Sequence, residues 1–128
     1  MENKKSMSIS VILPVHELTD ATTPLFLNAV KSVETQHVAP NELLIVVPKD
    51  SAVSEYVKSL DFSESTTNIV IVENDGNTDF ASQVNFGVSK ATSEWVSFLE
   101  CDDEYSNIWF KNVHKYQEAH QRKKTYRK

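Results

Sequence analysis

The feature that most constrains the fold of this chain is a regular alternation of two hydrophobic patterns. Short runs of almost continuous apolar character, such as "VIL" and "ELLIVV", alternate with longer segments whose apolar residues recur at helical spacing. A continuous apolar run is typical of a strand buried on both faces, as in a parallel sheet covered by helices. The runs predict strands over residues 8–17, 41–48, 67–74 and 94–100.

A helix is predicted after each strand, over residues 22–36, 51–60, 79–92 and 106–123. Because buried strands and amphipathic helices alternate, the sequence predicts an α/β domain of three layers, α/β/α, with a mainly parallel, Rossmann-like sheet. The residues expected to face the core are Leu25, Ala29, Val30 and Val33 in the first helix, Val53, Tyr56, Val57 and Leu60 in the second, Phe80, Val84, Val88 and Ala91 in the third, and Trp109, Val113 and Tyr116 in the last.

Length and charge limit the possible functions. The 128 residues, 40% of them hydrophobic, suffice for one domain with one core, predicted over residues 8–121 after a disordered N-terminus, residues 1–7. Residues 122–128 form a basic tail that holds five of the 13 Lys and Arg. We expect a solvated tail, although it could also touch an anionic membrane or another domain. The rest of the chain contains 8 basic and 18 acidic residues. This excess of negative charge argues against a nucleic-acid partner.

Cysteine content and hydropathy predict a cytoplasmic location. The single cysteine, Cys101, excludes an internal disulfide and fits a reducing compartment. No apolar run is long enough for a transmembrane segment, and the polar start "MENKKSMS" does not resemble a secretory signal.

Polar residues follow all four predicted strands. In parallel sheets, ligands bind outside the carboxyl ends of the strands. Those ends carry "PVHE", "PKDS", "ENDGN" and "ECDDE", and the last holds four acids within five residues. Clustered carboxylates repel one another, and a hard cation such as Mn²⁺ or Mg²⁺ relieves that repulsion.

Glu100 and Asp102 are two residues apart, so on a strand their carboxylates point to the same side and could bind one cation. Cys101, between them, would then point away from the ligand, toward the core. The alternative is a solvated acidic turn that begins the last helix.

The segment "NFGVSKATSEWVSFLECDDEY" resembles the core signature of family 2 glycosyltransferases, which have the GT-A fold of nucleotide-diphospho-sugar transferases. The first strand, "ISVILPVHE", resembles the opening strand of that family, and "NELLIVVPKDS" occupies the place of its second strand. The resemblance extends from about Ser8 to Tyr116. The residues in register with the signature are Asn85, Gly87, Ala91, Glu94, Trp95, Val96, Phe98, Leu99, Asp102 and Asp103.

The resemblance implies a function and a set of site residues. The function is transfer of a sugar from a nucleoside-diphosphate sugar, with a UDP-sugar favoured, to the hydroxyl of an unknown acceptor. Mn²⁺ or Mg²⁺ would bridge the diphosphate, bound by Asp102 and by Glu100 in an E-x-D version of the family's D-x-D motif. The residues implied to bind the nucleotide-sugar are Pro14, Val15, His16, Glu17, Asp50, Asn74, Asp75 and Glu100.

The sequence also departs from the family pattern. Pro48–Lys49–Asp50–Ser51 stands where the family often has Asp-Asp-Gly-Ser, so Asp50 could contact the base only with a shifted loop. The chain has about half the length of the family's catalytic domain, and no residue can be assigned as the catalytic base. We therefore expect either that this chain is the nucleotide-binding half of a longer protein, whose C-terminal half is missing here, or that it is a naturally short relative of the family.

Two other functions remain open. One is a degenerate, non-catalytic module that binds a nucleotide or serves in assembly, which Pro48 and Lys49 favour. The other is a nucleotidyltransferase, which normally carries a glycine-rich, basic loop after its first strand. That loop here is "PVHELTD", which contains neither glycine nor a basic residue, so this function ranks third.

Overall fold

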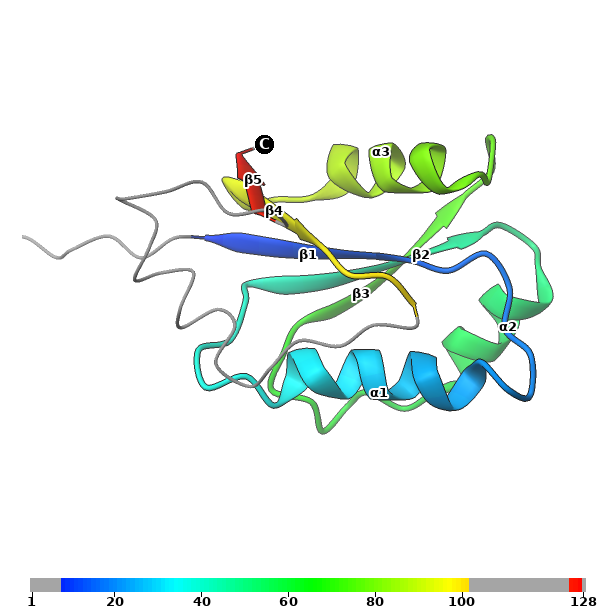
Figure 1. Cartoon of the computed structure of the whole chain (residues 1–128), viewed down its shortest axis with the longest axis horizontal. Coiled ribbons are helices and arrows are strands. Elements are labelled where there is room, and N and C mark those ends of the chain that lie inside the picture. Colours follow the sequence, from blue (N-terminus) through cyan, green and yellow to red (C-terminus); the bar gives the residue numbers. More distant parts are fainter. Residues whose placement is uncertain (1–7, 102–124, 128) are drawn as a thin grey trace, which may run out of the picture.

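The computed structural model describes residues 8–101 and 125–127, which form one five-stranded sheet flanked by helices (Figure 1). The strand order is β3-β2-β1-β4-β5, with β1 to β4 parallel and β5 antiparallel to β4. The predicted last helix, residues 106–123, lies outside the described residues. The elements are β1 (Ile9–Pro14), α1 (Thr23–Glu34), β2 (Glu42–Pro48), α2 (Ala52–Ser59), β3 (Ile69–Asn74), α3 (Phe80–Lys90), β4 (Trp95–Phe98) and β5 (Thr125–Arg127).

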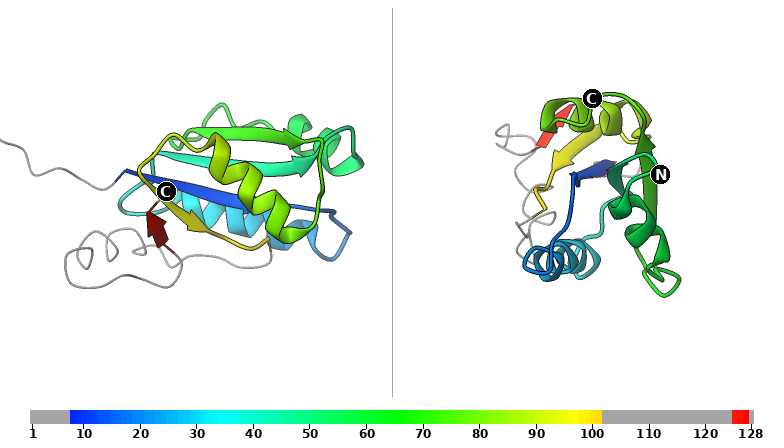
Figure 2. Two further views of the ribbon diagram at one scale, coloured as in Figure 1. Left: turned by 90° about the horizontal axis from the view of Figure 1, so that it is seen from above. Right: turned by 90° about the vertical axis from the view of Figure 1, so that its right-hand side faces the viewer.

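Helices cover both faces of the sheet, which confirms the predicted three-layer α/β/α architecture. Helices α1 and α2 lie on one face and α3 lies on the other (Figures 1 and 2). Successive strand residues point to opposite faces, so Val11 packs toward α1 and α2 whereas Ile12 packs toward α3. Leu43 and Leu44, their partners in β2, divide in the same way. Burial on both faces therefore explains why these strands read as continuous apolar runs.

Two helices differ from the prediction at their first turns. In α1, Ala29, Val30 and Val33 are buried as predicted, but Leu25 is 41% exposed and Phe26 is buried in its place. In α3 the buried residues are Gln83 and Gly87, whereas Phe80 is 58% exposed. Phe80 is the first residue of α3, and helical side chains tilt toward the N-terminus, so its ring projects past the edge of the sheet.

The end of the chain also differs from expectation. Thr125–Arg127 form β5, which pairs with β4 in the register Trp95↔Arg127. No strand was predicted within the tail. This strand forms because β4 offers an unpaired edge, and Thr and Tyr favour extended backbone. The rest of the tail and residues 1–7 lie outside the described part, and the domain boundaries stay predictions.

No helix among the described residues combines the length and the apolar character needed to cross a membrane.

Candidate functional site

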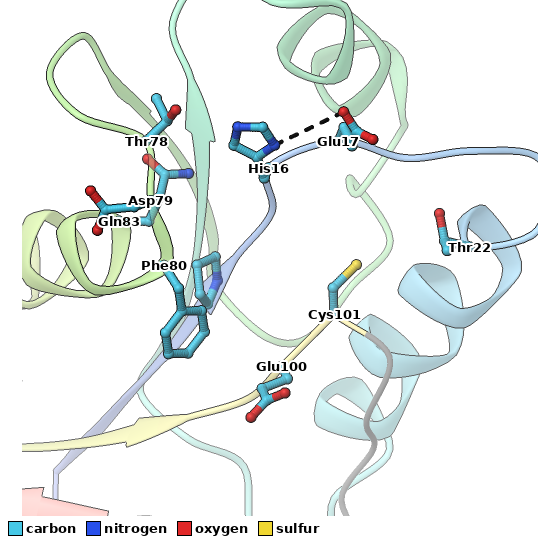
Figure 3. A pocket seen from close by; sticks show the side chains of 10 residues that line it. His16, Glu17, Thr22, Thr78, Asp79, Phe80, Gln83, Glu100 and Cys101 are labelled. Atoms are coloured by element: carbon cyan, nitrogen blue, oxygen red, sulfur yellow. Dashed lines mark ion pairs between the residues drawn. The ribbon is translucent and has the colours of Figure 1, made fainter.

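A cleft of about 440 Å³ opens at the carboxyl ends of β1 and β4, beside the first turn of α3 (Figure 3). It brings together two segments that are far apart in the sequence, the loop after β1 and the residues after β4. Its lining residues are Pro14, His16, Glu17, Thr22, Thr78, Asp79, Phe80, Gln83, Glu100 and Cys101.

Four of the residues predicted to bind the nucleotide-sugar line this cleft, namely Pro14, His16, Glu17 and Glu100. A fifth, Val15, is 1% exposed and packs in the core beneath it. Asp102, the predicted metal ligand, lies outside the described residues, and no group of three or more potential ligands occurs among those described. The cleft thus brings part of the predicted site together, the loop after β1 and Glu100.

The cleft is acidic. Glu17, Asp79 and Glu100 all line it, and none of the described lining residues is Lys or Arg. Among the described lining residues, His16 alone has a side chain that can carry a positive charge, and its Nδ1 lies 4.0 Å from Oε1 of Glu17. Both side chains are well exposed, so this contact is screened by water and holds neither firmly. A bound cation would offset the repulsion between these carboxylates and an anionic ligand.

Gln83 forms the floor of the cleft and ties three strands to α3. Its side chain is 1% exposed. Nε2 donates to the backbone oxygens of Val15 at 3.3 Å and Val46 at 3.2 Å. Oε1 accepts a hydrogen bond of 2.7 Å from Nδ2 of Asn74, the last residue of β3. One buried amide thus fixes the ends of β1, β2 and β3, and with them the start of the His16–Glu17 loop.

Asn74 is occupied by the fold. It is 4% exposed, and besides Gln83 its Nδ2 bonds to the oxygen of Asn77 at 2.8 Å. Its Oδ1 accepts from the amide of Gly76 at 3.0 Å, which closes the turn after β3. Asn74 and the exposed Asp75 were predicted to bind the nucleotide, but neither lines the cleft.

Asp50 occupies a glycine-like position in the turn after β2. Its φ is 58°, the only positive value for a non-glycine residue in the described chain. In the family pattern Asp-Asp-Gly-Ser the glycine stands at this point, so Pro48 and Lys49 occupy the positions of the two acids. Ser51 keeps the role of helix cap, because its Oγ accepts from the amide of Ser54 at 3.1 Å. Asp50 does not line the cleft.

Cys101 reaches the cleft as well as the core. It packs against the core cluster under α1 and α2, as expected, but it also lines the cleft, where its side chain lies on the side of Glu17 (Figure 3). The expectation that it points away from the ligand assumed strand alternation beyond residue 100. Strand β4 ends at Phe98, so that alternation no longer applies.

Sequence analysis missed the part that α3 plays in the cleft. Asp79 caps the helix: its Oδ1 accepts from the amide of Ser82 and its Oδ2 from the hydroxyl, both at 2.9 Å. An aspartate directly before an apolar periodic segment is a recognisable start signal for a helix. Nothing in the sequence marks Phe80 or Gln83 as residues of a site.

Capping by Asp79 should be visible in the dependence of stability on pH. The Ser82 amide, and secondly its hydroxyl, hold the pKa of Asp79 below its usual range. A carboxyl whose pKa is lower in the folded state than in the unfolded state stabilises the folded protein. This stabilisation is complete above the unfolded pKa of about 3.9, and it is lost as the pH falls through the folded pKa. Asp79→Asn keeps a capping oxygen but does not titrate. In urea unfolding between about pH 5 and pH 3, the variant should lose less stability than wild type; equal losses would contradict the assignment.

The comparisons with known proteins identify the family. The sequence profile of Glycosyl transferase family 2 matches residues 10–123, so the chain belongs to this family. Its α/β fold is the predicted GT-A type, shared with solved structures of low sequence identity. No curated protein sequence matches the chain.

The similar structures include two that were solved with a nucleotide-sugar. The crystal structure of S. aureus TarS 1–349 in complex with UDP-GlcNAc has a TM-score of 0.69 and 18% identity, over 89% of this chain and 32% of that chain. The mannosyltransferase PcManGT from Pyrobaculum calidifontis, in complex with GDP-Man and Mn²⁺, has a TM-score of 0.58 and 17% identity, over 79% of this chain and 29% of that chain. This chain therefore spans about a third of the length of the structures it matches.

Proposed function

We propose that this chain binds a nucleoside-diphosphate sugar together with Mn²⁺ or Mg²⁺ and forms the donor-binding part of a glycosyltransferase. The observation that carries the proposal is the meeting of His16, Glu17 and Glu100 in one cleft at the carboxyl edge of the sheet, in a chain of this family. The sugar would be transferred to an acceptor hydroxyl. Acceptor contacts and the catalytic base would come from a further part of the same protein.

The chemistry of the donor set fits a hard cation. Glu100 and Asp102 offer only carboxylate oxygens, which Mn²⁺ and Mg²⁺ accept together with phosphate oxygens. A cation bound there neutralises charge on the departing nucleoside diphosphate. The protein's own residues would position the donor: Pro14, His16 and Glu17 would form the nucleoside side of the cleft, and Val15, buried beneath it, would support them. Asn74 would contribute by closing the turn after β3, whereas Asp50 and Asp75 would have to approach the donor from outside the cleft.

The nature of the nucleotide is part of the proposal. UDP is favoured because the family commonly uses UDP-sugars, and the similar structure of TarS was solved with UDP-GlcNAc. A cytoplasmic location would fit a nucleotide-sugar donor and the single cysteine.

A second candidate is a module that binds a nucleotide without transferring a sugar. Pro48 and Lys49 favour it, because they replace two acids of the family pattern at the turn after β2. This candidate shares the donor site, so binding experiments do not separate it from the first. Hydrolysis or transfer assays with the full-length protein would.

Calorimetric titration of the chain with UDP, GDP and CDP, each with and without Mn²⁺, tests the donor site. One nucleotide should bind in the presence of Mn²⁺, and Asp102→Asn and Glu100→Gln should weaken that binding by about tenfold or more, the cost of removing a group that stabilises charge. Glu64→Gln is the matched control, since Glu64 is exposed and lies in the loop before β3, at the opposite edge of the sheet. Absence of nucleotide binding at millimolar concentration, or binding that ignores Mn²⁺, would overturn the donor site.

A further inference from the structure

Phe80 is exposed where a phenylalanine has no structural reason to be. It is the most exposed of the large apolar side chains in the described residues, at 58%. It belongs to neither core cluster, although it was expected in the core. It lines the cleft from the first turn of α3, while Glu100 lines it from the end of β4 (Figure 3). An exposed aromatic ring inside a cleft indicates a binding surface rather than part of the fold.

The charge of the cleft limits what can rest on this ring. Glu17, Asp79 and Glu100 line the same cleft as this ring, and none of the described lining residues is Lys or Arg. Phosphate groups would therefore stay near a cation at Glu100. The part of a ligand that lies against Phe80 has to be uncharged and at least partly apolar. In a nucleoside-diphosphate sugar, the planar nucleobase meets this condition best, because bases stack on aromatic side chains whatever their identity.

We propose that Phe80 is the stacking platform for the nucleobase of the donor, which rests on the proposed function and names a residue that family membership does not assign. Stacking gives affinity without choosing between bases. Choice among uracil, guanine and cytosine would then fall to polar groups at the rim of the cleft, such as the Thr78 hydroxyl and the His16 ring.

The experiment compares two probes, UDP and inorganic pyrophosphate, each titrated calorimetrically with Mn²⁺. Both carry the diphosphate, but only UDP carries a base. Phe80→Ala should weaken UDP binding by about 5- to 150-fold, the usual range for removing a base–aromatic stack. Pyrophosphate binding should stay unchanged. Phe80→Trp should bind UDP at least as tightly as wild type, because it keeps the stack.

Leu27→Ala is the matched control, since Leu27 is also an exposed apolar helix residue, at 41%, but does not line the cleft. Thermal unfolding of each variant verifies that it folds. Unchanged UDP affinity in Phe80→Ala would overturn the stacking role and leave the donor site standing. Equal weakening of UDP and pyrophosphate would also overturn it, because Phe80 would then act on the cation or the backbone. If wild type binds no nucleotide at all, the proposed function fails and this inference fails with it.

Discussion

Replacing Gln83 with leucine should lower the free energy of unfolding by about 2–4 kcal/mol, since each buried polar group left without a partner costs about 1–3 kcal/mol. Leucine fills a similar volume but removes every polar atom of the amide. The oxygen of Val15 loses its bond of 3.3 Å to Nε2, and Asn74 loses its bond of 2.7 Å to Oε1. Both lie in a region that water does not reach, because Gln83 itself is 1% exposed. Urea unfolding at neutral pH measures the loss.

Gln36→Leu is the matched control for this prediction. Gln36 is also a buried glutamine, at 8% exposed, and its Nε2 donates to the oxygen of Ser32. Its replacement gives the cost of removing a buried amide in general, and Gln83→Leu should cost more because the Gln83 amide joins three separate segments. A double-mutant cycle that combines Gln83→Leu with Asn74→Ala adds a second criterion. Because the two residues belong to one hydrogen-bond network, their effects on the free energy of unfolding should be coupled by about 0.5–3 kcal/mol. Additive losses would mean that Gln83 and Asn74 do not stabilise the site jointly.

Gly87→Ala should destabilise the domain by about 1–3 kcal/mol, the usual cost of overpacking a core. A β-carbon at this position would lie 2.7 Å from Cγ2 of Ile12 and 2.9 Å from Cγ2 of Val46. Both contacts are too short for carbon atoms, and both methyl groups belong to buried, β-branched residues with few alternative rotamers. Alanine is more favourable than glycine inside a helix by about 1 kcal/mol, which offsets part of this cost. Chemical unfolding of the variant gives the net value.

Gly76→Ala provides the comparison, because a β-carbon there meets only Oδ1 of Asn74, at 3.4 Å. It should change stability by no more than about 0.5 kcal/mol. Combining Gly87→Ala with Val46→Ala removes one of the two clashing methyl groups. The double variant should then lose less stability than the sum of the single variants. A neutral Gly87→Ala would show that the sheet and α3 are not in the close contact described.

Much of the fold can be predicted from the sequence because burial on both faces leaves a clear trace. Short, continuous apolar runs such as Leu43–Val47 are typical of central strands. Their alternation with helices predicts that neighbouring strands are parallel. The edge that carries the cleft follows from the same rule, since parallel strands present all their carboxyl ends together. His16 and Glu100 could therefore be expected at a common edge before any coordinates were known.

The remaining features depend on tertiary contacts that the sequence does not encode locally. Gln83 is a polar residue, but it is buried because groups at the ends of three strands bond to its amide. Phe80 is apolar by type and exposed by context, because it stands at the end of a helix beyond the sheet. The left-handed backbone of Asp50 is set by the turn, and β5 is recruited by an open strand edge. Patterns of residue type cannot detect any of these.

The strand order also has a consequence for how the molecule is made. β1 is synthesised first and lies in the middle of the sheet, between β2 and β4. Its pairing with β2 can form early, but its other side stays uncovered until Trp95–Phe98 have left the ribosome. During that interval an apolar strand presents an unsatisfied edge, a condition that exposes nascent chains to misassociation. Among the described strands, β4 therefore completes the pairing of the central strand, although it is the last of the four parallel strands to be made.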